Sequence, residues 1–510
     1  MPNPFIYSII LSALLSACAS STPTNQPQQW TLEAISLYSS DYEDSTEIVA
    51  IQASSLRAAV SNSKTGEVDI LDISNPYKLK RIARFSLHLN IGEELTSVDF
   101  HPTYDMFAVV IDTGLTRGRV QLHSASTGAL IDTTTVGYEP DAIVFAKQGH
   151  IALIANEGED FWFDPKNKQF FSAEGSVSII HINKTGKISA HNELALADIT
   201  NHEGFVILTN GHYLKREIDW NGDHIISHQQ DFNHDGLINN KKVLLGSFEG
   251  HPVFGNELKG EAGILIPIKS YSPALLEPEY IAISPDAKRA YVTLQEENAV
   301  AVVDLTSEKI IRYFNLGSAT HTMDSHADGW IQFDQSQTST REPDGIATIV
   351  NGRYFVTADE GDADFATKEP EDNIFSGGRS VSVFDAYSGN FVGDTGNQLD
   401  EIAYQHGVYP ELRSNKKGIE PEMVVSFEMA GKDYVVVDLE RAGAIVLIDM
   451  SEPTQPKAIA LGKIPGDEEK SPEGIAHFTI DNQHYILTAN EMNGTVACFK
   501  ISTKKSVVNP

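Results

Sequence analysis

Long apolar runs are missing from this chain of 510 residues. The longest, Phe5 to Ala17 (FIYSIILSALLSA), is shorter than the roughly 20 residues of a membrane-spanning helix and ends in small residues. It is typical of the hydrophobic region of a signal peptide. Cysteine is also scarce, with only Cys18 and Cys498 present. We expect no disulfide between them, because Cys18 lies inside the export signal and Cys498 falls at an apolar strand position.

Positively charged residues are also few compared with negatively charged ones. The chain has 38 Lys and Arg against 70 Asp and Glu, a formal net charge of -32. Nucleic acid and anionic membranes are disfavoured as partners, because both would be repelled. Divalent cations and cationic partners are favoured instead. The alternative is that the acidic surface only keeps the protein soluble.

The motifs of several enzyme classes are absent as well. We find no GxSxG elbow, no HExxH, no phosphate-binding Gly-Lys loop and no cysteine nucleophile, so no catalytic residue is assigned. His477 could be a metal ligand or a base, or a structural histidine. Arg341 and Arg441 could clamp an anion, or simply pair with the acidic turns beside them.

The N-terminal segment predicts an anchor. Leu15-Ser16-Ala17-Cys18 resembles a bacterial lipobox, in which the cysteine is acylated and becomes the mature N-terminus. Residues 1–17 would be the signal peptide, and 18–29 a disordered tether rich in Ser, Thr, Pro, Asn and Gln. Ala19 after the cysteine favours an outer-membrane lipoprotein, facing the periplasm or the surface. Because Met1 to Pro4 lack Lys and Arg, cleavage without lipidation remains the alternative.

Seven copies of one strand pattern follow the tether. Apolar residues alternate with period two, which favours strands over helices. The copies are EVDILDI from Glu67, RVQLHSA from Arg119, SVSIIHI from Ser176, AVAVVDL from Ala299, SVSVFDA from Ser380, AIVLIDM from Ala444 and TVACFKI from Thr495. Most copies are preceded by a second apolar strand. Before that strand lies a further apolar strand, which itself begins at an acidic turn. Three strands and a variable fourth are typical of one propeller blade.

The repeats predict an all-β fold, a seven-bladed β-propeller over residues 30–502 with a polar tail at 503–510. The last copy lacks an outer strand, which Trp30 to Tyr38 can supply, so that the ring closes without exposed edges. A loop insertion is expected at about 195–273, where an eighth, degenerate blade is the alternative. A pair of β-sandwiches would not repeat a three-element motif seven times.

In a propeller, the turn entering the innermost strand and the turn joining the second and third strands open on the same face, and in several blades both turns are acidic. The predicted acidic rim comprises Glu139, Asp141, Glu277, Glu279, Glu342, Asp344, Asp359, Glu360, Asp362, Glu420, Glu422 and Glu473. So many like charges on one rim require cations or protonation unless each is well solvated. Oxygen ligands of this kind suit Ca²⁺ or Mg²⁺. For each single Glu of an EP turn, the alternative is a latch onto backbone amides of the next blade.

The predicted insertion contains a sharper signal, a candidate calcium loop. Asp231, Asn233 and Asp235 match the oxygen donors of such a loop, with Gly236 at the sharp turn. Lys242 stands where an EF-hand has its bidentate Glu. A further carboxylate ligand would have to come from elsewhere, for example from the similar segment Asp219 to Asp223 that precedes the loop. The candidate metal ligands are Asp219, Asn221, Asp223, Asp231, Asn233, Asp235 and Asn239. Asx-turns in an exposed loop are the alternative.

Several segments together resemble the choice-of-anchor I family. They are LEPEYIAISPDAKRAYVTLQEENAVAVVDL from Leu276, REPDGIA, TADEGD, IEPEMVVSFEMAGKDYVVVDLERAGAIVLIDMSEP, SPEGIAHF and LTANEMNGTVACF. The resemblance covers roughly Glu47 to Ile501, departs from the pattern at about Asn192 to Ser272, and implies a propeller. The family is similar to mesenchyme-specific cell-surface glycoproteins, which are associated with biomineralisation. Its members carry different surface anchors, and some are labelled alkaline phosphatases.

We therefore expect a lipid-anchored, exported, monomeric propeller that binds Ca²⁺, uses no organic cofactor, and presents an acidic face to an unidentified ligand or protein. The alternative is a metal-dependent phosphoesterase, in which rim carboxylates hold Ca²⁺ ions that bridge a phosphate. A third interpretation is a lactone- or sugar-acting propeller enzyme. That interpretation needs a central metal with His or Asn ligands, for which the sequence shows no obvious set.

Overall fold

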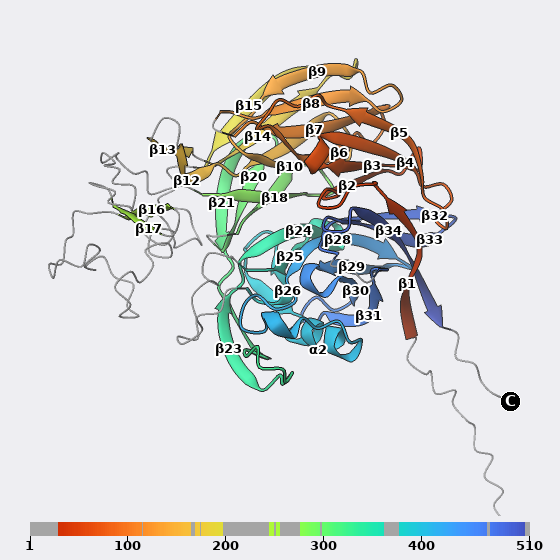
Figure 1. Cartoon of the computed structure of the whole chain (residues 1–510), viewed down its shortest axis with the longest axis vertical. Helices are drawn as coiled ribbons and strands as arrows, with labels where there is room; N and C mark the ends of the chain where they lie inside the picture. The colour runs from red at the N-terminus through yellow and green to blue at the C-terminus, as the bar shows by residue number, and fades with distance from the viewer. Residues whose placement is uncertain are drawn as a thin grey trace, which may run out of the picture.

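The computed structural model describes residues 29–114, 116–164, 169–173, 175–196, 244–248, 251–254, 276–295, 298–361, 377–466 and 470–504. Within these residues, seven four-stranded antiparallel sheets form the blades of a propeller (Figure 1). The predicted all-β, seven-bladed fold is confirmed.

The blades follow one another along the chain, and within each the strands run from innermost to outermost. Blade 1 is β2 (Val49–Gln52), β3 (Arg57–Asn62), β4 (Glu67–Asp72) and β5 (Lys80–Ser86). Blade 2 is β6 (Glu94–Phe100), β7 (Met106–Asp112), β8 (Arg119–Ser124) and β9 (Leu130–Thr135). Blade 3 is β10 (Pro140–Phe145), β11 (Ile151–Asn156), β14 (Ser176–Ile182) and β15 (Ile188–Ala195).

The second half continues this order. Blade 4 is β18 (Pro278–Ile283), β19 (Arg289–Leu294), β20 (Ala299–Asp304) and β21 (Lys309–Asn315). Blade 5 is β24 (Pro343–Ile349), β25 (Tyr354–Asp359), β26 (Ser380–Asp385) and β27 (Phe391–Asp394). Blade 6 is β28 (Pro421–Met429), β29 (Lys432–Leu439), β30 (Ala444–Asp449) and β31 (Lys457–Lys463). Blade 7 is β32 (Pro472–Ile480), β33 (Gln483–Asn490), β34 (Thr495–Lys504) and β1 (Gln29–Ser39).

Smaller elements project from the connections between these strands. They are the hairpins β12 (Glu159–Asp164) with β13 (Gln169–Ala173), β16 (Leu244–Phe248) with β17 (His251–Phe254), and β22 (Ser318–Met323) with β23 (Gln335–Thr340), and the helix α2 (Gln398–Gln405). Most of the predicted insertion at about 195–273 lies outside the described residues. No helix among the described residues has the length and apolarity to cross a membrane.

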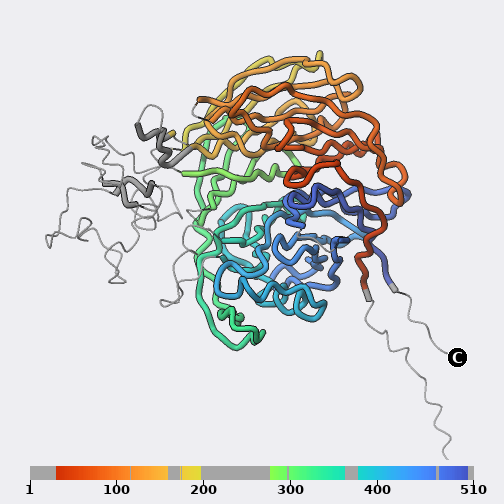
Figure 2. The backbone as a smooth tube through the Cα atoms, viewed as in Figure 1, coloured from red at the N-terminus to blue at the C-terminus, as the bar shows by residue number. Residues whose placement is uncertain are grey.

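The ring closes through contacts at its centre and through its two terminal strands. Each innermost strand contacts the innermost strands of both neighbouring blades, including β32 against β2. The N-terminal strand β1 pairs antiparallel with β34, from Gln29 opposite Lys504 to Ser39 opposite Thr495. Figure 2 shows the red N-terminal and blue C-terminal segments side by side. The predicted closure by residues 30–38 is confirmed, and the last strand ends two residues beyond the expected boundary.

The core lies between blades, which explains the apolar strand pattern. Successive side chains of a strand point to opposite faces of its sheet. In β30, Val446 and Ile448 pack in the core shared by blades 5 and 6, whereas Ile445 and Leu447 pack between blades 6 and 7. Because both faces of a middle strand are buried, five of the six β30 residues are fully enclosed.

Candidate functional site

A β-bulge opens the innermost strand of most blades, and it carries the acidic residue of the repeat. In blades 3 to 7 the bulge directly follows a proline, so that one or two residues of the strand have no partner opposite. A bulge bends its strand and redirects the unpaired side chain. The carboxylates at these bulges are Asp141, Glu279, Asp344, Glu422 and Glu473.

A backbone hydrogen bond ties most of these bulges to a second acidic turn. The carbonyl oxygen of the residue before the proline accepts from an amide that follows the second strand. The pairs are Glu157 N–H to Glu139 O, Gly361 N–H to Glu342 O, Glu440 N–H to Glu420 O and Glu491 N–H to Ser471 O. The four acceptor residues have φ between 41° and 52°, a left-handed conformation that is uncommon outside glycine. Both acidic turns of a blade are thereby held against each other.

The bulged side chains meet at one cavity of about 370 Å³ at the propeller centre, which we call the mouth cavity. Its lining residues are Glu47, Ile48, Glu94, Thr96, Asp112, Glu139, Asp141, Glu279, Tyr280, Gln295, Asp344, Glu422, Met423 and Glu473. Six of them, Glu47, Asp141, Glu279, Asp344, Glu422 and Glu473, occupy equivalent positions in six blades and are called the ring carboxylates. In blade 2 the bulged residue is Thr96.

Burial and mutual repulsion raise the pKa values of several ring carboxylates. Burial raises the pKa of Glu47 to about 8, and Glu491, Glu94 and Asp141 add to the rise. Burial likewise raises the pKa of Glu473 to about 10, with Glu440 next in effect. For Asp141 burial raises the pKa to about 6, while a hydrogen bond shared with Glu279 opposes the rise. Glu47 and Glu473 therefore keep their protons at neutral pH.

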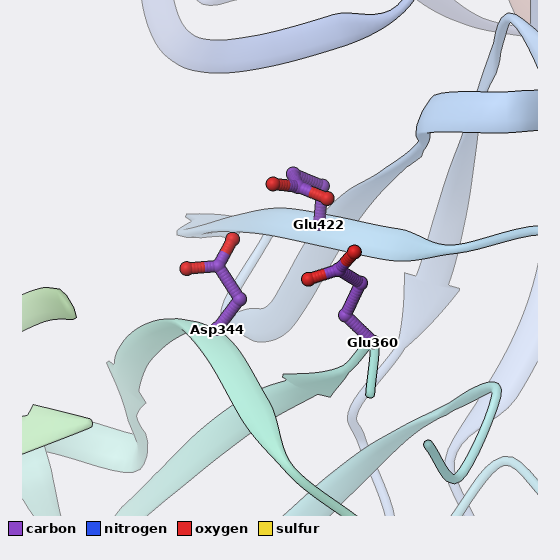
Figure 3. A group of neighbouring side chains, drawn as sticks. All are labelled: Asp344, Glu360 and Glu422. Atoms are coloured by element: carbon purple, nitrogen blue, oxygen red, sulfur yellow. The ribbon is translucent and has the colours of Figure 1, made fainter. Parts of the chain in front are cut away.

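Blades 5 and 6 concentrate this charge. Asp344, Glu360 and Glu422 bring carboxylate oxygens within 4.8 Å of one another. Figure 3 shows their side chains converging, Asp344 from β24, Glu422 from β28 and Glu360 from the turn after β25. Burial and then the charge of Glu360 raise the pKa values of both Asp344 and Glu422 well above the usual range.

Glu420 has the opposite environment from the ring carboxylates. Its fully buried side chain pairs with Arg413, with Arg441 Nε at 3.1 Å and with Lys417 Nζ at 3.6 Å. Burial alone would raise the pKa of Glu420, but these three cations lower it. Glu420 is therefore structural, but its partners are the side chains of three cations and not the backbone amides of the next blade that the alternative for EP turns predicts.

Tyr280 contributes an aromatic surface to the mouth cavity. It follows the blade 4 bulge and packs against the hydrophobic cores of blades 3 and 4, of blades 4 and 5, and of blades 6 and 7. A side chain that touches cores on different sides of the ring must extend across the centre. Tyr280, Ile48 and Met423 thus give an acidic cavity a partly apolar lining.

The structure places the described rim residues in four different surroundings. Those that line the mouth cavity are Glu139, Asp141, Glu279, Asp344, Glu422 and Glu473. Glu360 lies next to the cavity, close to Asp344 and Glu422. Glu277, Glu342 and Glu420 are buried in the turns around the cavity. Asp359 lies inside blade 5, because it is still paired in β25 and accepts from the hydroxyls of Thr357, Ser380 and Ser382.

Other predicted site residues lie outside the described part of the chain. They are Asp362, the lipidation residue Cys18, and the calcium-loop residues Asp219, Asn221, Asp223, Asp231, Asn233, Asp235 and Asn239. Of the candidates for catalysis, His477 packs its ring against Phe427 and lies 2.9 Å from His484. Arg341 pairs with Asp394 and Arg441 with Glu420 and Glu440.

The rim prediction missed residues that the structure brings to the cavity. Glu47 was overlooked because blade 1 has Thr46 where blades 3 to 7 have proline, although its place before the first strand is equivalent. The same lack of proline hid Glu94 and Thr96 of blade 2. Aligning strand starts instead of EP motifs would have found them. Lys417 gave no repeat signal, because it lies in the connection between blades 5 and 6.

The chain was also compared with known proteins. The family model described as choice-of-anchor I domain matches residues 47–235, 262–374 and 364–453. No curated protein matches the chain.

Similar solved structures include the Cps50 (Swd1) β-propeller domain of Myceliophteria thermophila, at 8% identity over 91% of this chain and 99% of that chain (TM-score 0.48). They also include hydrazine synthase of Kuenenia stuttgartiensis, at 10% identity over 92% and 98% (TM-score 0.49). The strand pairing, not this likeness, establishes the propeller.

Proposed function

Because the chain belongs to the choice-of-anchor I domain family, whose members are associated with cell-surface or exported proteins, we propose that it is an exported propeller that binds divalent cations. A lipid on Cys18 would hold it in the outer membrane, facing the periplasm or the surface. The mouth of the propeller, loaded with Ca²⁺, would present an acidic face to a ligand or a protein partner.

The observation that carries this proposal is the convergence of six ring carboxylates from six blades on one cavity. Like charges at such distances in a partly buried site repel strongly, and only protons or cations can relieve the repulsion. Carboxylate oxygens are the ligands that Ca²⁺ prefers, and the cavity has room for the waters that complete its coordination. Divalent cations would therefore replace protons at neutral pH.

Calorimetric titration of Ca²⁺ into the purified protein at pH 7.5 tests the proposal. We expect a saturable heat, and a rise in the melting temperature that EDTA reverses. A cation at 100 times its dissociation constant would add about 2.7 kcal/mol to the free energy of unfolding. No heat and no change in melting temperature would contradict cation binding.

The same titration with Asp231→Ala and Asp235→Ala separates the predicted calcium loop from the mouth cavity. Loss of only part of the bound Ca²⁺ would assign the remainder to the propeller. If the two substitutions abolish all binding, the mouth cavity does not hold the ion.

The alternative, a metal-dependent phosphoesterase, would use the same carboxylates to hold ions that bridge a phosphate. It predicts the release of inorganic phosphate from a simple phosphate ester in the presence of Ca²⁺. EDTA and the Asp344→Asn substitution would each abolish this release. Calcium binding without phosphate release would contradict the phosphoesterase alternative and support cation binding only.

A further inference from the structure

Two groups of carboxylates at the mouth cavity share one residue, Glu360. The first group is Asp344, Glu360 and Glu422, and the second is Glu360, Glu420 and Glu440. In each group the carboxylate oxygens lie within 4.8 Å of one another, the spacing of oxygens around a bound cation. Their surroundings differ, and this difference indicates which group can take an ion.

The second group is already neutralised by the protein. Lys417 Nζ pairs with Glu360 and lies 3.6 Å from Glu420. Arg441 lies 3.1 Å from Glu420 and 2.8 Å from Glu440, and Arg413 also pairs with Glu420. Three fixed cations thus face three carboxylates, and Lys417 Nζ contacts two of the three, Glu360 and Glu420.

In the first group only Glu360 has a cation partner, Lys417, whereas Asp344 and Glu422 form no ion pair among the described residues. Asp344 is 8% exposed, and its carboxyl shares a hydrogen bond with another carboxyl, Glu422. The Oε2 atom of Glu422 is buried and has no hydrogen-bond partner among the described residues. An orphaned buried acceptor costs free energy, about 1–3 kcal/mol for a neutral group and more for a charged one. Gln295 Nε2 donates to Glu360 Oε2 at 2.6 Å and orients the third carboxylate.

We propose that Asp344, Glu360 and Glu422 are the ligands of one divalent cation, and that Lys417 prevents a second ion from binding beside it. The proposal rests on the proposed function, because it names the residues that carry the cation binding of the mouth. Asp344 and Glu422 line the cavity, so an ion and its remaining water ligands can enter from solvent. The orphaned Glu422 oxygen would gain its missing partner.

Titrating Ca²⁺ into variants of the whole chain tests this site. Asp344→Asn and Glu422→Gln should each weaken binding at least about tenfold, because each removes a ligand. Glu47→Gln removes the equivalent ring carboxyl group of another blade and should weaken binding much less. Glu428→Gln is the matched control, since Glu428 lies on the same strand as Glu422 and its side chain is exposed. Its affinity should match that of the parent protein.

Lys417→Met tests the second half of the proposal by stoichiometry. The parent protein should bind one Ca²⁺ at the mouth, and this variant two, whereas Lys417→Arg should still bind one. Should Lys417→Met fail to fold, the ligand variants still decide the site. Equal losses for Glu47→Gln, Asp344→Asn and Glu422→Gln would overturn the site and leave diffuse cation binding intact. An absence of Ca²⁺ binding in the parent protein would overturn the proposed function itself.

Discussion

At the scale of single residues, what a carboxylate does in this protein depends on its neighbours. Glu420 and Glu422 are two positions apart in one turn, yet Glu420 is surrounded by cations and Glu422 by other carboxylates. The bulge explains the difference, because it turns Glu422 toward the cavity while Glu420 stays in the turn. Substituting Glu420 should therefore affect stability, whereas substituting Glu422 should affect cation binding.

Glu420→Gln should strongly destabilise the fold. The substitution leaves Arg413, Lys417 and Arg441 around a neutral amide, and breaking a buried ion pair in this way costs about 3–5 kcal/mol. Urea unfolding followed by circular dichroism measures the loss. The exposed Glu428→Gln on the same strand should stay within about 0.5 kcal/mol of the parent protein. Equal midpoints for the two variants would show that Glu420 is not structural.

Stability should fall as pH rises from 7 to 9 when divalent cations are removed by EDTA. Glu47 and Glu473, with pKa values of about 8 and 10, keep protons in the folded protein that the unfolded chain releases near pH 4. The folded state then binds more protons than the unfolded state, so its stability declines with pH, by on the order of 4 kcal/mol over this range.

The comparison is urea unfolding at pH 7 and pH 9. Saturating Ca²⁺ should remove most of the decrease in the free energy of unfolding between pH 7 and pH 9. In EDTA, Glu47→Gln should make this decrease smaller, because the substituted side chain no longer titrates. A stability that is constant or rises over this range in EDTA would contradict the raised pKa values.

At the scale of strands, the terminal strand β1 completes blade 7 and closes the ring. Its register with β34 covers nearly the whole of both strands, with one irregularity between Ala34 and Ser36. The strand packs its inward side chains on blades 6 and 7, and Leu32 belongs to the core between them. Closure of this kind links the stability of all blades to one short segment.

Leu32→Ala should therefore cost about 2–4 kcal/mol in the free energy of unfolding, as for other buried leucines. Leu32 is 7% exposed, whereas Leu37 on the same strand is 45% exposed. The matched substitution Leu37→Ala should cost less than about 1 kcal/mol. Guanidinium unfolding of both variants makes the comparison. Similar losses would mean that β1 is held by backbone pairing alone.

At the scale of the whole molecule, ring closure collects at one mouth the carboxylates that lie far apart in the sequence. Glu47 and Glu473 are separated by most of the chain, yet both line the mouth cavity. With a net charge of -32, the molecule as a whole attracts cations and repels anionic surfaces. An acidic protein of this kind needs a specific anchor to stay at a membrane, which is the role predicted for Cys18.

Cys18→Ser should release the protein from the membrane. The parent protein should fractionate with membranes and incorporate a labelled fatty acid, whereas the variant should do neither, because its hydroxyl replaces the thiol that lipidation requires. Cell fractionation and labelling measure both effects, and Asp41→Ser, an exposed position in the propeller, is the control. Identical fractionation of the Cys18→Ser and parent proteins would contradict lipid anchoring.

The sequence by itself determined the number of blades, their strand order and the closing strand. These features depend on local patterns, since alternating apolar residues specify a strand whose two faces are both buried between blades. In blades 3 to 7 the proline and acidic residue at the start of the innermost strand also coincide with the bulges, which we did not predict. Because these sequence patterns recur in successive blades, they can be recognised without knowing which distant segments lie close together in the fold.

Only the tertiary structure decided which carboxylates share a site. The grouping of Asp344, Glu360 and Glu422 depends on how far each blade is rotated around the ring, and no local pattern encodes that angle. The same holds for Lys417, which pairs with Glu360 and Glu420 from a connection that has no counterpart in the repeats. Electrostatic interactions depend on distance in space, and the ring sets that distance only when its first and last strands pair.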